Sequence, residues 1–138
     1  MNITTYNSKH HSNPLNTFYV LSKGLNSGRP MSRPCANSLV VKANTEYEKQ
    51  KLFGYTYVLW KTGRFHGYQV GSVIPFLRIE DYKRILLNTM ESPKIDHMRI
   101  QTVLKHVVGL QNRQAALLNT VKVLKATEDA IIRSCIRF

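Results

Sequence analysis

The chain has 138 residues, which is enough for one domain with appendages and too few for two ordinary domains. Its formal net charge of +12 favours a polyanionic partner, and no apolar run approaches the roughly 18 residues that a membrane span requires. The opening residues lack the apolar core of a secretory signal, and Cys35 and Cys135 form no disulfide framework, so we expect a cytoplasmic protein with no membrane partner.

The first elements predicted along the chain are a tail and a strand. Residues 1–14 are polar and show no periodicity, which predicts a flexible tail. His10 and His11 could bind a stray metal ion in it, but they have no further ligands nearby, so no metal site is predicted. The β-branched and aromatic run Thr17–Leu21 predicts a strand.

A long loop is expected over Ser22–Asn37, because this segment is rich in Gly, Pro, Ser and Asn. Glycines allow close approach to a ligand and arginines present forked donors, so the loop suits phosphate contacts, although a solvated connector explains it equally well. Neither Gly24 nor Gly28 is followed by the Lys-Ser/Thr of a phosphate loop, which argues against an NTPase. The basic residues of the loop are Lys23, Arg29 and Arg33.

Ser38–Ala43 predicts a second strand, followed by a helix that runs to about Lys61. Asn44 or Thr45 can cap the start of this helix, and Gly63 can end it. Its core-facing residues are expected to be Leu52, Tyr55 and Leu59, with Phe53 and Trp60 as candidate members.

The loop Thr62–Gln69 combines an arginine, a histidine and two aromatic residues. An exposed group of this kind could read base edges or stack on bases. Alternatively, Phe65 and Tyr68 hold the loop down against the core. The predicted nucleic-acid contacts of the whole chain are Lys23, Arg29, Arg33, Lys61, Arg64 and His66.

Val70–Phe76 predicts a short strand ending at Pro75, and Ile79–Met90 predicts an amphipathic helix. The residues of this helix expected to face inward are Ile79, Tyr82, Ile85 and Leu86. The order strand, strand, helix, strand, helix predicts an α+β fold in which a small mixed sheet packs with two helices, in a module over residues 15–91.

Residues 92–138 predict one or two long helices that start at Ser92 and Pro93, with any break near Gly109 to Asn112. Apolar residues recur there at alternating spacings of three and four, as in a coiled-coil seam that Gln114 and Glu128 interrupt. The predicted dimer seam contains Ile100, Val103, Val107, Leu117, Val121 and Leu124.

An alternative for Gln101–Thr120 is a helix-turn-helix, with Gly109 at the turn and Arg113 at the start of a recognition helix. Two positions disagree with this motif. Lys105 stands where a small residue should pack, and Ala115 is undersized for the inner face.

Three motifs, LSKGLNSGRPMSRPCANSLVV, LWKTGRFHGY and GSVIPFLRIEDYKRI, give Leu21–Ile85 a resemblance to a family of short uncharacterised bacterial proteins associated with mobile elements. That family carries no known activity. Its members often have a second cysteine where this chain has Ser38, so a Cys-x-x-Cys redox or metal function is not available here.

Residues 37–85 are also distantly similar to the distal half of a target recognition domain in type I restriction-modification specificity subunits. There a strand leads to a helix, a Gly-Ser-x-x-Pro-type turn and a short helix, before a long dimerising helix. The resemblance implies that the loops before Asn37 and around Arg64 face DNA. At the start of the spacer Glu91–Ile95 replaces the expected Pro-Pro-x-x-Glu-Gln run, which speaks against docking onto a methyltransferase subunit. The resemblance to target recognition domains also implies four scaffold positions, which are Gly71, Ser72, Pro75 and Asp81.

Catalysis has little support, because the acidic residues fit helix starts or surface positions and a Cys35 and His66 pair lacks a third group to orient it. We therefore expect a non-enzymatic module without cofactor or metal that binds double-stranded DNA and is dimeric through its C-terminal helices. The alternative is a protein-interaction accessory of a phage or mobile element that docks on a host or virion complex. A third possibility is a component of a larger protein complex.

Overall fold

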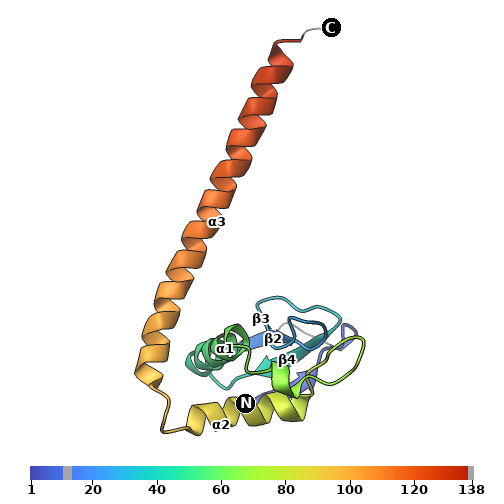
Figure 1. The fold of residues 1–138 in the computed structure, drawn as a ribbon, viewed down its shortest axis with the longest axis vertical. Helices are drawn as coiled ribbons and strands as arrows, with labels where there is room; N and C mark the ends of the chain where they lie inside the picture. Colours follow the sequence, from blue (N-terminus) through green and yellow to red (C-terminus); the bar gives the residue numbers. More distant parts are fainter. Residues whose placement is uncertain (11–13, 137–138) are drawn as a thin grey trace. The chain divides into compact units, whose positions relative to one another are not determined.

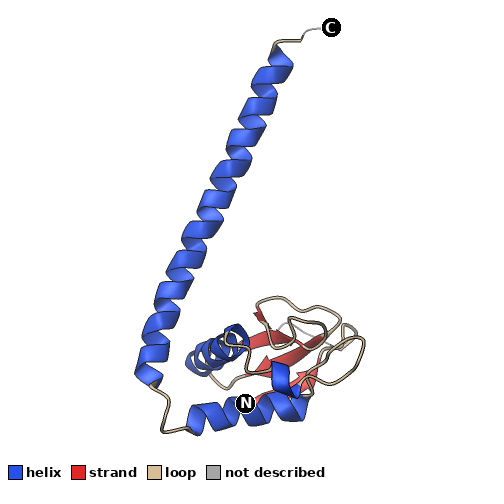
Figure 2. Cartoon of the chain, in the orientation of Figure 1, coloured by secondary structure: helices blue, strands red, loops and turns tan. Residues whose placement is uncertain are grey.

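The computed structural model describes residues 1–10 and 14–136 of the chain (Figures 1 and 2). The chain divides into two units, Met1–Gln101 and Thr102–Phe138. In the described residues, the first unit contains a four-stranded sheet, two α-helices and a short 3-10 helix, and the second consists of most of one long helix. This architecture confirms the predicted α+β class.

The sheet has the strand order β1-β4-β2-β3. Its strands are β1 (Asn2–Thr5), β2 (Thr17–Leu21), β3 (Pro30–Met31) and β4 (Ser38–Lys42). Every described pairing is antiparallel, with Tyr19 opposite Val40 in the ladder between β2 and β4. The predicted mixed sheet is wrong in this respect, because a neighbouring parallel pair needs a long crossover, usually a helix, and every described helix comes after β4 in the chain.

Strand β1 corrects the prediction of a flexible tail over residues 1–14. Asn2 pairs with Lys42 and Thr5 with Leu39, and the side chain of Ile3 packs against the core. The segment was missed because it is polar, although its β-branched Ile3, Thr4 and Thr5 favour a strand. His11 of the predicted histidine pair lies outside the described residues.

The hydrophobic core lies between one face of the sheet and the helices α1 (Glu46–Lys61) and α2 (Ile79–Glu91). Phe18 and Val20 of β2 share this face, because alternate residues of a strand point the same way. The helix residues predicted to face inward are buried there: Leu52, Tyr55, Leu59, Tyr82, Ile85 and Leu86. The candidate members Phe53 and Trp60 are partly buried against the same core, and so is Ile79, which was also predicted to face inward.

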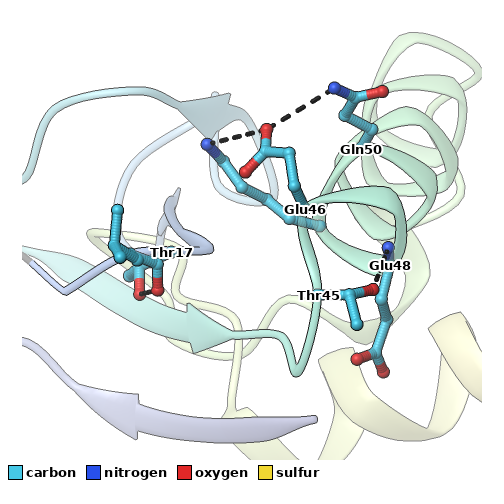
Figure 3. A network of polar contacts seen from close by, with 7 residues as sticks. Thr17, Thr45, Glu46, Glu48 and Gln50 are labelled. Atoms are coloured by element: carbon cyan, nitrogen blue, oxygen red, sulfur yellow. Dashed lines mark hydrogen bonds and ion pairs between the residues drawn. The ribbon is translucent and has the colours of Figure 1, made fainter.

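Helix α1 begins with a side-chain cap at Thr45, as predicted (Figure 3). The Thr45 hydroxyl accepts a hydrogen bond from the Glu48 N–H at 3.1 Å, and the Glu48 carboxylate accepts one from the Asn44 N–H at 2.6 Å. Lys49 and Gln50 both donate to the Glu46 carboxylate at 3.5 Å. The bonds from the N–H groups of Glu48 and Asn44 satisfy backbone donors that a helix start otherwise leaves without a partner.

The other end of α1 is closed by Gly63, also as predicted. The N–H of Gly63 donates to the Trp60 carbonyl at 3.1 Å, and the N–H of Arg64 donates to the Leu59 carbonyl at 2.9 Å. This pair of bonds is a Schellman motif, which needs a residue with positive φ, and Gly63 has φ +70°. The motif reverses the chain and directs it into the next loop.

Val70–Phe76 does not form the predicted strand. Val70 and Phe76 exchange backbone hydrogen bonds of 2.9 and 2.8 Å across a tight loop, and the ladder does not continue beyond this bridge. Gly71 has φ +103°, and a Cβ there would lie 2.6 Å from the carbonyl oxygen of Ile74. The tight bend explains why a β-rich run fails to extend.

Helix α3 (His97–Ser134) starts later than predicted and is continuous. Asp96 caps its start, because the Asp96 carboxylate accepts a hydrogen bond from the Arg99 N–H at 2.9 Å. Ser92 instead is the C-cap of α2, and a turn follows it. The helix runs through Gly109, so the alternatives of two helices and of a helix-turn-helix are both wrong. One glycine costs a helix only about 1 kcal/mol, too little to break it here.

Candidate nucleic-acid interface

Two segments far apart in the sequence lie against each other in the first unit. They are residues 22–37 and residues 62–77, and we call them the paired loops. Gly28 has φ +96°, and a Cβ there would lie 2.2 Å from the ring of Phe65, so the ring occupies the space of the absent side chain. Gln69 donates to the buried hydroxyl of Ser27 at 2.7 Å. These contacts lock the two loops together.

Backbone hydrogen bonds join the paired loops at a second place. The Gly24 N–H donates to the Pro75 carbonyl at 2.7 Å, and the Leu77 N–H donates to the Ser22 carbonyl at 2.8 Å. Lys23 forms an isolated bridge with Phe76. The turn containing Gly71, Ser72 and Pro75 is thereby fixed to the start of the long basic loop. Anchoring of this kind lowers the entropic cost of presenting side chains to a ligand.

Two of the predicted basic residues converge on the ring of Trp60. The guanidinium of Arg29 lies 5.7 Å from the ring centroid, and the ammonium of Lys61 lies 4.9 Å from it. Lys61 is also 5.9 Å from the ring centroid of Tyr57. Cations over aromatic faces are held by the ring quadrupole, so these contacts fix two exposed positive charges at neighbouring positions. Arg29 belongs to the first of the paired loops, and Lys61 is the last residue of α1, shortly before the second loop.

Arg64 and His66 follow directly on this cluster. Both are exposed, and the Nδ1 atom of His66 would lie 3.3 Å from a Cβ at Gly63. His66 belongs to the short 3-10 helix η1 (His66–Tyr68). Because these residues stand at the C-terminal end of α1, where the helix dipole is negative, an anion here must be bound by side chains.

The remaining two predicted residues lie at other points of the paired loops. Lys23 is exposed beside the bridge to Phe76, and Arg33 is exposed in the stretch that follows β3. Among the residues that the structure describes, none of the six predicted contacts forms an ion pair. The positive charges of the five Lys and Arg residues are therefore not neutralised by these ion pairs.

Sequence reasoning missed a second basic pair on α2. Asp81 is only 4% exposed, and its carboxylate accepts from Arg78 at 2.7 Å and from Arg84 at 2.6 Å. Arg84 also lies 5.6 Å from the ring centroid of Tyr68, which is exposed. The spacing of three residues on either side of Asp81 could have revealed this arrangement, because such residues are neighbours on a helix. The two arginines thus hold the buried Asp81 carboxylate in ion pairs of 2.7 and 2.6 Å.

Phe65 is buried, in accordance with the interpretation that it holds the loop down. Tyr68 remains exposed, so the two aromatic residues of this loop have different environments. Buried hydroxyls elsewhere in the unit are satisfied: Thr56 and Tyr82 share a hydrogen bond of 2.7 Å, and Tyr55 bonds to His97. Burial raises the pKa of Tyr82 far above its usual range, with a smaller opposing effect from Thr56.

The sequence model of a family of unknown function, DUF6943, matches residues 3–134. The chain is a member of DUF6943. The match includes parts of both units and confirms that the family is an uncharacterised one. No curated protein and no solved structure matches this DUF6943 chain.

Two further properties of the DUF6943 chain concern its described residues only. None of their helices combines the length and the apolar character needed to cross a membrane. Within the same residues, no three His, Cys, Asp or Glu side chains are grouped so that they could hold a metal ion. Cys35 and Cys135 are both free and exposed.

Proposed function

We propose that the protein is a non-enzymatic module that binds double-stranded DNA through the paired loops and the adjoining end of α1. The observation that carries the proposal is the meeting of Arg29 and Lys61 on Trp60, beside Arg64 and His66, in a chain of net charge +12. Exposed cations that lack acidic partners bind phosphates with release of counterions. The aromatic ring limits the mobility of two of them, which reduces the entropy lost on binding.

The distant similarity to target recognition domains supports DNA as the anion. The order of β4, α1, the turn at Gly71–Pro75, α2 and the long α3 is the order that this similarity implies. In this proposal α3 pairs two copies of the module, as a specificity subunit joins its two recognition domains. The free cysteines Cys35 and Cys135 are compatible with a reducing cytoplasm.

The test is duplex-DNA binding, measured by fluorescence anisotropy over a series of salt concentrations. If the five Lys and Arg residues among the six predicted contacts each neutralise a phosphate, log K should fall against log salt with a slope of about −4.5. The triple variant Arg29→Ala, Lys61→Ala, Arg64→Ala should bind more weakly and with a slope shallower by about 3. Thermal melting followed by circular dichroism would establish that the variant is folded.

A matched control removes the same charge elsewhere in the first unit. The triple variant Lys9→Ala, Lys42→Ala, Lys83→Ala changes three exposed lysines outside the paired loops. It should retain the slope of the native chain. Equal losses in both triple variants would mean that binding follows net charge alone, and no binding of the native chain at low salt would exclude DNA.

One observation favours the second candidate, a protein-interaction accessory that docks on a larger complex. Val73 is 89% exposed and Leu25 is 78% exposed, on neighbouring parts of the paired loops, with Ile74 exposed beside Val73. Exposed apolar residues in contiguous loops are typical of protein contacts. Binding that depends on them should persist as salt rises, whereas DNA binding should weaken steeply.

A further inference from the structure

Most of α3 carries an apolar stripe of exposed residues. Every described residue from 108 to 136 is exposed, and Leu117 and Leu124 are 67% and 63% exposed. Ile100 is different, because it packs against the core of the first unit. Ile100 of the predicted dimer seam is therefore partly covered within the first unit, and we take the exposed stripe to start at Val103.

The stripe follows a heptad repeat from Val103 to Cys135. The positions called a contain Val107, Gln114, Val121, Glu128 and Cys135. The positions called d contain Val103, Leu110, Leu117, Leu124 and Ile131. Two of the five a residues, Val107 and Val121, are β-branched, and three of the d residues are leucine, a combination that favours two parallel strands in a coiled coil.

We propose that α3 pairs with α3 of a second copy of this chain as a parallel, in-register, two-stranded coiled coil from Val103 onward. The inference rests on the dimer included in the proposed function and deepens it by fixing its orientation and register. The sequence of the stripe fits a second copy of the chain, and the residue that indicates this is Gln114.

Gln114 selects the parallel arrangement. In a parallel, in-register pair the two Gln114 amides face each other and can exchange a hydrogen bond. In an antiparallel pair a residue at an a position faces a d position, and all d positions here are apolar. The Gln114 amide would then be buried without a partner, which is costly.

The flanking positions do not oppose self-pairing. The g and e residues that approach each other in a parallel pair are His106 with Gln111, Arg113 with Leu118, Thr120 with Lys125 and Thr127 with Ile132. No such pair brings together two Lys or Arg side chains or two carboxylates. Glu128 is the one unfavourable a residue, since it meets its own copy, and Lys125 lies one turn before it on the same helix.

The first test is sedimentation velocity of the full chain at concentrations up to about 100 μM, without DNA. A mass of twice 15.9 kDa is expected for the native chain. Leu124→Glu should reduce the mass to that of one chain, whereas Val123→Glu, at an exposed position off the stripe, should leave it doubled. Because both residues are exposed, neither change affects the fold of the first unit. A native monomer, a higher oligomer or equal effects of the two variants would overturn the pairing.

The second test uses Cys135 as a reporter of orientation. In the Cys35→Ser variant, Cys135 is the sole thiol of the chain, and a parallel pair brings the two copies of this a residue opposite each other. Oxidation with diamide should convert most of the protein to a cross-linked dimer, and the added Leu124→Glu change should abolish the cross-link. A dimer by sedimentation that does not cross-link is antiparallel or out of register. That result overturns the orientation and leaves the proposed dimer standing, while a monomer overturns both.

Discussion

Gly28 is the residue at which the two loops of the candidate interface meet. Its positive φ and the ring of Phe65 both act against any side chain there, but through different physical effects. Backbone strain depends on φ alone, whereas the clash depends on what the Cβ touches. Gly24 has nearly the same φ, +92°, and nothing lies within 4 Å of its Cβ position. The chain therefore contains its own comparison between strain and clash.

We expect Gly28→Ala to lower the free energy of unfolding by about 2 to 4 kcal/mol, because strain and overpacking both contribute. Gly24→Ala should cost about 1 kcal/mol, which is the strain alone. Urea denaturation of the two variants beside the native chain measures both. Adding Phe65→Leu should recover part of the loss in the Gly28 variant, and equal losses at the two glycines would show that the ring yields without cost.

The capping box of α1 makes a prediction for that helix. Thr45→Ala removes the acceptor for the Glu48 N–H and should lower the unfolding free energy by about 1 kcal/mol. Thr45→Asp keeps an acceptor at the same place and should restore most of the loss. Thermal melting followed by circular dichroism would measure the difference. If both variants melt together, the contribution comes from the threonine methyl group instead of the hydrogen bond.

Elements with clear periodicity could be predicted from the sequence, and irregular ones could not. β2, β4, α1 and α2 follow their apolar patterns, because burial of one face decides where they form. β3 has only two residues and lies within the long loop, so no pattern marks it. The start of α3 was misplaced because Ser92–Pro93 and Asp96 are both suitable helix starts in the sequence, and only Asp96 is used.

The basic residues of the candidate site could be named from the sequence, but their grouping could not. Arg29 and Lys61 approach one ring, and Gly28 beside Arg29 accommodates Phe65; both are tertiary contacts without a local signal in the sequence. Arg78, Asp81 and Arg84 are the opposite case, since their spacing on one helix is visible in the sequence. Local spacing is thus readable, while convergence of distant segments requires the fold.

At the scale of the whole molecule, alkaline stability reflects buried tyrosines on both faces of the sheet. Burial raises the pKa of Tyr19, Tyr55 and Tyr82 above the usual value of about 10. The folded state therefore keeps these protons at a pH where the unfolded chain loses them. Their contribution to stability is complete below pH ~10 and declines as pH rises further, by up to about 1.4 kcal/mol per unit for each tyrosine.

The contribution of these tyrosines to the unfolding free energy should therefore be constant from pH 8 to about 9.5. Above pH ~10 the unfolding free energy should fall. Tyr82→Phe should make the fall less steep, at a small cost at neutral pH from the lost bond to Thr56. The exposed Tyr68 provides a control, since Tyr68→Phe should leave the steepness unchanged. Urea titrations at several pH values would measure how steeply the unfolding free energy falls with pH. An equally steep fall for the native chain, Tyr82→Phe and Tyr68→Phe would contradict the role of burial.

The edges of the sheet affect how the protein behaves at high concentration. One edge is β1, whose exposed residues are polar, and the other is β3, which has two residues and begins with Pro30. Short polar edges and edge prolines discourage the strand-to-strand addition that starts amyloid growth. A chain with this much uncovered apolar surface on one helix is thus protected at its sheet, and crowding should drive it toward reversible helix association while leaving fibril formation disfavoured.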